Sequence, residues 1–294
     1  MGMVMGKLFN KRDFLRLLGS AAVAAPTAVV AAKATQDGKS ETRKESAYER
    51  VMRTNTLRCG YAIWEPGFSI DLKTGKPAGI YYDFFETIGQ HTGLKMEWVG
   101  EIGWGDYPAA LNSGRIDAMC FGAWPKANLA REILFSEPTY YLPIYAYVRK
   151  GDARFDHAVE KINSPSVTIS TMDSELSSEL ARTRFPRAKT FSIPENSAAS
   201  MLLLNVAAGK ADVTDAYHGD AYMKANPDTI KVVPLEHPLR LFGHTIPVAK
   251  NEYSLLALLN AATDEIIDSG EFEAIVHKYE PTPGVLLMRK EDYQ

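Results

Sequence analysis

The sequence predicts an α/β protein of two lobes, each a mainly parallel sheet flanked by helices. Short hydrophobic segments that read as strands alternate with helical segments along most of the chain, which is typical of parallel sheets with covered faces. A late extended segment, residues 241–249, would return the chain to the lobe in which it began. About 250 residues remain beyond an apolar leader and a polar stretch, enough for two cores. We therefore expect two antiparallel crossover strands that serve as a hinge, with one cleft between the lobes.

Residues 1–34 read as an export signal similar to a twin-arginine (Tat) leader. Residues 11–16, K-R-D-F-L-R, are close to the twin-arginine consensus, with Lys in place of the first Arg, and an uncharged run continues to Ala32. The alternative is an uncleaved membrane anchor, because about 20 apolar residues normally span a bilayer. We predict a Tat-exported periplasmic protein whose signal is followed by a polar linker over residues 35–50.

The first lobe is predicted to consist of residues 51–147 and 241–294. One of its helices opens near Gly79 and ends at Gly93, where glycine suits the helix end, and Asp83 is placed to cap the free amides at the helix start. The other elements expected in this lobe are strands at residues 57–61, 95–99 and 116–121 and helices at residues 107–113, 254–269 and 271–278.

The second lobe is predicted to consist of residues 148–240. The chain would enter it through an extended segment, residues 144–152, and leave it through the segment at residues 241–249. The elements expected between these crossovers are strands at residues 166–170, 190–192, 211–215 and 230–233 and helices at residues 175–183 and 198–208.

Charge and composition narrow the possible partners. The net charge is −3 without a long basic run, so we expect neither nucleic acid nor an anionic membrane surface as a partner. The six histidines lack the spacing of metal ligands and there is no glycine-rich phosphate loop, so we expect no metal and no cofactor. The two cysteines, Cys59 and Cys120, lie in predicted strands; an oxidising compartment permits a disulfide, but we expect buried free thiols.

Residues 104–141 carry the most specific motifs. They contain the run W-G-D-Y-P-A-A-L-N-S-G-R-I-D-A and end in F-S-E-P-T-Y-Y. These motifs resemble the family 3 bacterial extracellular solute-binding proteins, the amino-acid-type receptors of ABC importers, and the resemblance covers about residues 57–279. It implies a periplasmic clamshell whose lobes close around a small-molecule ligand and which is presented to an ABC permease in the inner membrane. We expect a monomer.

The family's grip on a ligand carboxylate is altered in this chain. Members that bind amino acids hold the α-carboxylate with an Arg six residues before the Phe-Ser pair, and that position is Leu129 here. Lys126 or Arg131 could substitute for the missing Arg. A second carboxylate site of the family, a Gly-Thr-Thr turn that opens a helix, corresponds to residues 171–175. There Asp173 would repel a carboxylate or serve only as a helix cap.

The family's site for the ligand's amino group is retained. Residues 209–215, G-K-A-D-V-T-D, resemble a family motif whose final Asp receives the ammonium group, so the resemblance gives this role to Asp215. Asp117 and Asp212 stand in equivalent places before Ala or Val in two predicted strands, and we expect both to be structural.

Aromatic residues are expected beside the predicted cleft. Trp124 follows the strand at residues 116–121 and is expected to contact the ligand, and Phe68 occupies a family position whose ring stacks on it. Aromatic faces together with carboxylates favour a cation, by about 0.5–2 kcal/mol for each ring. The full set of predicted ligand-binding residues is Trp64, Phe68, Trp104, Trp124, Tyr141, Asp173 and Asp215.

These observations favour a receptor for a small amine or other cationic solute without a free α-carboxylate. One alternative is an amino-acid receptor with rearranged carboxylate contacts. Another is a periplasmic dehydratase similar to cyclohexadienyl dehydratases, in which Glu175 would be the general acid. A third is a sensory receptor that uses the same clamshell without transport.

Overall fold

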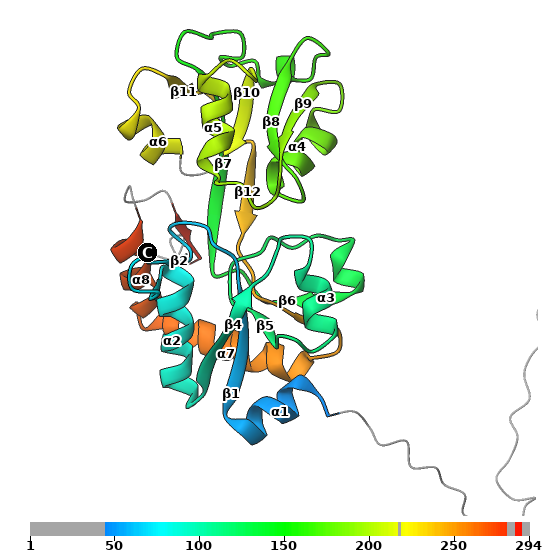
Figure 1. Cartoon of the computed structure of the whole chain (residues 1–294), viewed down its shortest axis with the longest axis vertical. Helices are drawn as coiled ribbons and strands as arrows, with labels where there is room; N and C mark the ends of the chain where they lie inside the picture. The colour runs from blue at the N-terminus through cyan, green and yellow to red at the C-terminus, as the bar shows by residue number, and fades with distance from the viewer. Residues whose placement is uncertain (1–44, 217–218, 281–285, 290–294) are drawn as a thin grey trace, which may run out of the picture. The chain divides into compact units, whose positions relative to one another are not determined.

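The computed structural model describes residues 45–216, 219–280 and 286–289. All of them belong to one compact unit, Lys44–Gln294, built from two main sheets with flanking helices (Figure 1). The predicted signal peptide and most of the predicted linker lie outside the described residues. Among the residues that are described, no helix combines the length and the apolar composition that a membrane crossing requires.

The first sheet holds five strands, and its centre is parallel. Strand β1 lies between β4 and β5 and runs parallel to both, whereas β13 is antiparallel to β5 and β6. Helix α2 packs against β4, α7 and α8 (Figure 1). The elements are β1 (Thr56–Tyr61), β4 (Lys95–Glu101), β5 (Ala118–Met119), β6 (Ile133–Phe135), β13 (Pro247–Ala249), α1 (Ala47–Thr54), α2 (Ile80–Thr92), α3 (Tyr107–Asn112), α7 (Tyr253–Asp268) and α8 (Glu271–Tyr279).

The second sheet is organised around β7 and β8. Strand β8 is parallel to β9 and β10, while β7 is antiparallel to β10, β11, β12 and β14. Helix α4 packs on β8, and α5 packs on β10. The elements are β7 (Tyr140–Arg149), β8 (Thr168–Met172), β9 (Lys189–Ile193), β10 (Val213–Ala216), β11 (Ile230–Val232), β12 (Arg240–Gly243), β14 (Leu287–Met288), α4 (Leu176–Arg184), α5 (Ser200–Ala207) and α6 (Gly219–Ala225).

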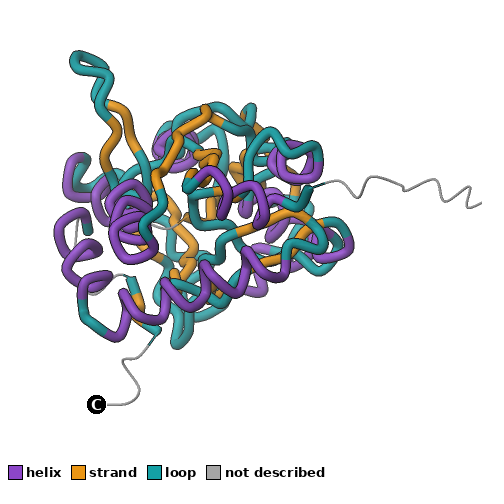
Figure 2. Tube along the Cα trace, turned by 90° about the horizontal axis from the view of Figure 1, so that it is seen from below, coloured by secondary structure: helices purple, strands orange, loops and turns teal. Residues whose placement is uncertain are grey.

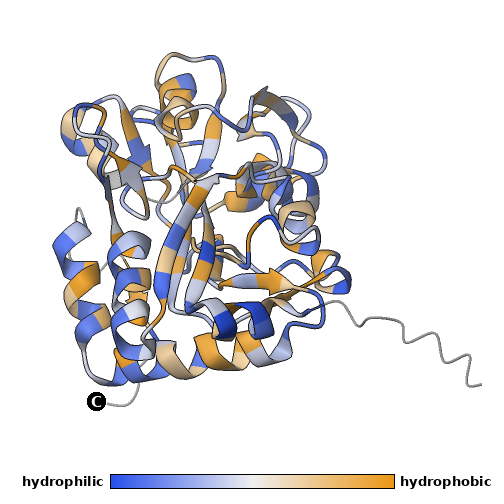
Figure 3. Ribbon diagram, turned by 60° about the horizontal axis from the view of Figure 1, so that its bottom comes forward, coloured by the Kyte–Doolittle hydropathy of each residue, from blue (hydrophilic) through white to orange (hydrophobic). Residues whose placement is uncertain are grey.

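Helices lie around the strands in the view of Figure 2, as expected for a parallel sheet that must be covered on both faces. The helices carry both hydrophobic and hydrophilic residues (Figure 3), because one side of each is buried against a sheet and the other is exposed. A small hairpin, β2 (Ser69–Ile70) with β3 (Pro77–Ala78), and two short 3-10 helices, η1 (Leu129–Arg131) and η2 (Val159–Ile162), complete the described elements.

Strand β7 contributes to the hydrophobic cores of both lobes, and its Tyr147 packs in a third cluster with Leu203 and Val206 of α5. Its residues Leu142 and Ile144 belong to the core of the first lobe, and Ala146 and Val148 belong to that of the second. Strand β12 pairs with it in antiparallel register over Arg240–Gly243, so two antiparallel strands connect the lobes, as predicted. The predicted single strand at residues 241–249 is in fact two, β12 and β13, because the backbone between them bonds to Tyr140 and Ala123 instead of continuing a ladder.

Two predictions about helix ends have different outcomes. Helix α2 does end at Gly93, which has a left-handed φ of 73°. The predicted cap at its start is wrong, because Asp83 makes no capping hydrogen bond there. The Asp83 carboxylate instead accepts hydrogen bonds from Lys278 Nζ at 2.7 Å and Tyr279 Oη at 2.9 Å, and so ties α2 to α8.

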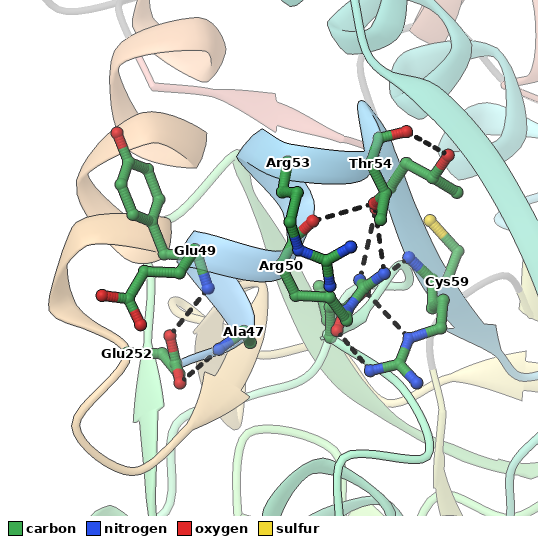
Figure 4. A network of polar contacts seen from close by, with 12 residues as sticks. Ala47, Glu49, Arg50, Arg53, Thr54, Cys59 and Glu252 are labelled. Carbon is green, nitrogen blue, oxygen red and sulfur yellow. Dashed lines mark hydrogen bonds and ion pairs between the residues drawn. The ribbon is translucent and has the colours of Figure 1, made fainter. Parts of the chain in front are cut away.

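Helix α1 begins inside the predicted linker. Ser46 and Glu49 form a capping box, in which the Ser46 side chain accepts from the Glu49 amide and the Glu49 carboxylate accepts from the Ser46 amide. Glu252, at the start of α7, also accepts from the amides of Ala47 at 2.8 Å and Tyr48 at 3.1 Å (Figure 4). The last residues of the predicted linker, 47–50, are therefore helical, because these acceptors satisfy the free amides of the first turn.

Asp117 and Asp212 have matching structural roles, as predicted. Asp117 accepts from the Arg58 amide of β1 at 2.7 Å and also contacts the guanidinium groups of Arg58 and Arg50. Asp212 accepts from the Thr168 amide of β8 at 2.9 Å and pairs with Arg154 at 2.7 Å. Each carboxylate thus connects the parallel strands of its own lobe.

The two cysteines form a disulfide, so the prediction of free thiols is wrong. Cys59 in β1 and Cys120 just after β5 are both fully buried, and their Cα atoms lie 5.1 Å apart. Strands β1 and β5 are direct neighbours in the sheet, with Cys59 opposite Ala118. The sequence separation of 61 residues gave no information on this adjacency.

We expect loss of the disulfide to destabilise the protein. Replacing both cysteines with Ala should lower the free energy of unfolding by about 2–4 kcal/mol, because the crosslink restricts a long loop in the unfolded chain. Urea denaturation of the oxidised wild type and the variant measures this difference. A reducing agent should weaken the wild type and leave the variant unchanged; equal stability of the two oxidised proteins would contradict the expectation.

Candidate ligand-binding site

A cavity of about 440 Å³ lies between the loop that follows β1 and the elements of the second lobe. The loop contributes residues 63–65, and the opposite wall comes from α4, α5, α6 and β10. Most of the wall is apolar, with Leu176 of α4 and Leu202 and Leu203 of α5 as its most buried apolar members. The polar residues of the described lining are Glu65, Glu175, Ser197, Ser200, Asp215, Tyr222 and Asn226. Of the three acidic ones, Glu65 is exposed and Glu175 and Asp215 are buried.

The fold brings Glu175 and Asp215 to the same wall. Strands β8 and β10 are parallel neighbours, with Thr214 opposite Ser170. Asp215 lies near the carboxyl end of β10, and Glu175 lies in the turn after the carboxyl end of β8. Because the carboxyl ends of parallel strands meet at one edge of a sheet, both side chains reach the cavity there.

Asp215 is buried without a compensating charge. Its side chain is 6% exposed, and its Oδ2 atom has no hydrogen-bond partner among the described residues. Burial raises the pKa of Asp215 to about 8, and the nearby Glu175 carboxyl adds to this shift. The side chain therefore holds an oxygen in the cavity that is ready to accept a hydrogen bond.

Glu175 is buried but has partners of its own. It is 4% exposed and caps helix α4, where its Oε2 accepts from the Ser177 amide at 2.8 Å and from Ser177 Oγ at 2.7 Å. Burial raises the pKa of Glu175, while these hydrogen bonds and the charge of Lys126 act in the opposite direction. Glu175, and not Asp173, is therefore the cap of this helix.

Three tryptophans form a chain beside the cavity. Trp64 is half-buried and lines it. Its ring centroid lies 5.9 Å from that of Trp104, which in turn stacks on Trp124 at 6.0 Å. Trp104 and Trp124 line a separate small hollow with Lys126 and Ser174. Of these predicted contact residues, only Trp64 thus lies on the main cavity.

Phe68 and Tyr141 are placed away from the cavity lining. Phe68 is fully buried in the first core, stacked on Tyr61 at 4.3 Å and 5.1 Å from the ring of Trp98, so no face of its ring is open to a ligand. Tyr141 lies in β7 between β12 and β14. Because aromatic neighbours cover the ring, the structure offers no support for the expected stacking of Phe68 on a ligand, which stays a prediction.

Asp173 is also outside the cavity. It is exposed, accepts a hydrogen bond from Ser192 Oγ at 2.5 Å and lines a different, open hollow with Arg182. The turn that it begins directs Glu175 inward instead, so the acidic residue that faces the cavity is two positions later than predicted.

The possible replacements for the missing Arg do not line the cavity either. Leu129 and Arg131 lie in η1, and Arg131 is exposed. The Lys126 ammonium lies 3.7 Å from Glu179 Oε2 and 4.7 Å from the centroid of the Trp124 ring. The described lining of the cavity contains no Lys and no Arg. Within the described ranges, no group of three acidic, His or Cys side chains could hold a metal ion.

Several lining residues were not predicted from the sequence. Ile63, Tyr222 and Asn226 belong to a loop and to the α6 region, which carry no motif. Glu175 was considered only as a catalytic acid. Glu175 follows β8, which is parallel to β10, the strand that carries Asp215. This arrangement is the signal that could have placed both acidic residues in one site.

Solved structures with the same fold are binding proteins and a sensor domain. An ancestral amino-acid-binding protein, a precursor of cyclohexadienyl dehydratase, is 22% identical with a TM-score of 0.69, covering 80% of this chain and 99% of that chain. A binding component of an ABC transporter from Wolinella succinogenes, complexed with lysine, is 18% identical with a TM-score of 0.69, covering 78% and 97%. A histidine kinase sensor domain is 20% identical with a TM-score of 0.66, covering 79% and 97%. These likenesses show the fold alone.

A comparison with curated protein sequences finds no significant match. The family model for bacterial extracellular solute-binding proteins, family 3, matches residues 57–282, which is well over half of the chain. The match includes nearly all of both sheets, apart from β14, together with the two crossover strands and the strand ends that carry Glu175 and Asp215. This protein therefore belongs to the family 3 bacterial extracellular solute-binding proteins, as its motifs predicted.

Proposed function

We propose that this protein is the receptor of an ABC importer for a small amine or other cationic solute that lacks a free α-carboxylate. The observation that carries the proposal is the pair of buried carboxyl groups, Glu175 and Asp215, in a cavity whose described lining has no basic residue. A buried carboxylate is costly without a partner, so a cation is the ligand group that this cavity favours.

The details of the cavity suit an ammonium group with an apolar body. Asp215 Oδ2 can accept a charge-assisted hydrogen bond from the ammonium. The ring of Trp64 on the facing loop can add a cation–π contact. Leu202 and Leu203 offer the apolar surface against which an alkyl chain would pack.

A ligand carboxylate would be repelled in this cavity and would find no free basic partner in its described lining. It would have to enter beside two buried acidic side chains, and Lys126, the basic residue whose charge acts on Glu175, is already paired with Glu179. Like charges in a buried site disfavour each other. The alternative of an ordinary amino acid therefore requires contacts that the described lining does not offer, although the similar Wolinella protein is complexed with lysine.

A dehydratase is the second candidate. The observation that favours it is the buried Glu175, whose raised pKa suits a proton donor, together with the likeness to a dehydratase precursor. Against it, acidic cyclic substrates would face the same two carboxyl groups. Incubation with prephenate and arogenate decides the question, and we expect no turnover.

Membership of an extracellular solute-binding family supports a periplasmic location and an ABC permease as partner. Export by the twin-arginine route, a cleaved leader and a monomeric state belong to the same proposal. Because the solved sensor domain shares the fold, a sensory role would use the same cavity. Neighbouring permease and ATPase genes would favour import over sensing.

A thermal-shift screen of several hundred small solutes tests the proposed ligand class. A ligand at 100 times its dissociation constant stabilises the folded state by about 2.7 kcal/mol, which is readily detected. Calorimetry should then show binding of amines or quaternary ammonium compounds and weaker binding of the matching α-amino acids. Tight binding of a common amino acid without amine binding would overturn the proposal.

We expect Asp215→Asn to weaken amine binding by about 2–5 kcal/mol, because it removes the buried charge that pairs with the ammonium. Calorimetry with the best amine from the screen measures the change. Asp173→Asn is the matched control, because it removes an exposed Asp of the same lobe outside the cavity. If both variants bind like the wild type, Asp215 does not hold the ligand.

Ligand affinity should increase with pH. Below its pKa of about 8, Asp215 keeps a proton in the empty cavity, and a cation must displace it. The dissociation constant should therefore fall by up to about tenfold for each pH unit between pH 6 and pH 8, then level off. Calorimetry over this range with a quaternary ammonium ligand, which does not titrate, measures the effect. The same constant at every pH would refute it.

The stability of the ligand-free protein should change in the opposite direction. With a pKa of about 8 in the folded state against an ordinary 3.8, Asp215 binds a proton that the unfolded chain has lost. The contribution of Asp215 to the free energy of unfolding is fully present below pH 4 and is lost as the pH rises towards 8. Urea denaturation at pH 5 and pH 8 should show a smaller pH dependence in Asp215→Asn than in the wild type. Equal dependence in both proteins would exclude this titration.

A further inference from the structure

The cavity receives acidic residues from both lobes. Glu65 belongs to the loop that follows β1, and Glu175 and Asp215 come from the opposite wall. The described lining contains no Lys and no Arg, so three carboxyl groups share a cavity of about 440 Å³ without a basic partner in that lining. A ligand with one ammonium group would bring a single positive charge to these three groups.

The buried member of this set points to a ligand. Asp215 is 6% exposed, lines the cavity and leaves its Oδ2 atom without a hydrogen-bond partner among the described residues. A buried polar atom in that condition needs a donor, and an ammonium group supplies one together with a compensating charge. Glu175 does not compete for this donor, because its Oε2 already accepts from the Ser177 amide and hydroxyl.

Glu65 is a second available carboxyl group, at a different depth of the cavity. It is exposed, unlike Asp215, and it makes no hydrogen bond or ion pair with another described residue. The loop that carries it is fixed, because Trp64 and Phe68 exchange backbone hydrogen bonds of 2.9 and 3.0 Å across it. Phe68 is fully buried in the core of the first lobe and so anchors this turn. The first lobe therefore holds one carboxyl group at the cavity, and the second lobe holds the other.

Apolar groups make up most of the remaining wall. Leu176, Leu202 and Leu203 line the side of the second lobe, and the half-buried Trp64 lines the side of the first lobe, next to Glu65. Methylene groups gain free energy when such surfaces remove them from water. An alkyl chain with a positive charge at each end thus matches a cavity that has apolar walls and an available carboxyl group on each lobe.

We infer that Glu65 contacts a second ammonium group and that the ligand is therefore a diamine: Asp215 of the second lobe binds one end, and Glu65 of the first lobe binds the other. The inference rests on the proposed function, because it narrows the cationic solutes to those with two positive groups. Such a ligand connects the two lobes, so it binds best when they are closed around it.

Two pairs of probes test the inference, because the members of each pair differ only by a second ammonium group: pentylamine with cadaverine, and norleucine with lysine. Calorimetry on the folded receptor gives its preference for the member with two ammonium groups. Glu65→Gln removes the exposed charge at nearly constant size. Glu97→Gln is the matched control, because Glu97 is an exposed residue of β4 in the same lobe and is not part of the described lining.

We expect the wild type to bind cadaverine about fivefold more tightly than pentylamine, the upper range for an exposed ion pair. Loss of that pair in Glu65→Gln should leave only the factor of about two that the two equivalent ends of cadaverine give. Glu97→Gln should keep the wild-type preference. A wild type without this preference, a Glu65→Gln variant that keeps it, or an equal loss in Glu97→Gln would overturn the inference.

The proposed function is judged by a different comparison, cadaverine against lysine in the wild type. If lysine binds more tightly, and its advantage over norleucine disappears in Glu65→Gln, the proposed function falls while the role of Glu65 stands. If cadaverine binds more tightly than lysine but no better than pentylamine, the proposed function stands and the role of Glu65 falls. If none of the four probes binds, the inference is overturned, and the thermal-shift screen alone decides the proposed function.

Discussion

The whole arrangement depends on β7, a single strand whose side chains pack in the hydrophobic cores of both lobes. Leu142 and Ile144 pack in the first core, and Ala146 and Val148 pack in the second. Strand β10 pairs with the part of β7 that lies in the second lobe, and this pairing places Asp215 opposite Ala146. The same strand, β7, carries the chain out of the first lobe. The position of the Asp215 carboxyl group is thus set by the connection between the lobes.

The cavity holds two buried carboxyl groups, whose charge is costly unless a proton or a cation offsets it. Two carboxyl groups are buried at the ends of neighbouring parallel strands, and burial raises the pKa of both. One of them, Glu175, recovers part of this cost through hydrogen bonds to its helix. The other, Asp215, does not, and a group in that condition within a cavity is typical of a functional site rather than of a structural one.

Much of the fold could be predicted because hydrophobic periodicity and turn residues are local signals. The ends of α2 at Gly93 and the structural roles of Asp117 and Asp212 are examples. The disulfide and the burial of Phe68 could not, since both depend on which strands become neighbours. In the candidate site, a motif predicted Asp215, and the structure places it in the cavity lining. The sequence predicted Asp173 as the acidic ligand contact of the neighbouring turn, but Glu175 lines the cavity instead, because the packing of that turn and not a local signal decides which side chain faces inward.

The start of helix α1 is capped by two acceptors, and this has a practical consequence. Its first turn is satisfied by Glu252 of α7 (Figure 4) and by Ser46, and Arg53 pairs with Glu45 at 2.8 Å. Among the described residues, the groups that cap α1 therefore begin at Glu45. A truncated protein that starts at Glu45 keeps these interactions. One that starts at Ala47 loses the Ser46 cap of the Glu49 amide and the Arg53–Glu45 pair, so the first turn of α1 is expected to fray.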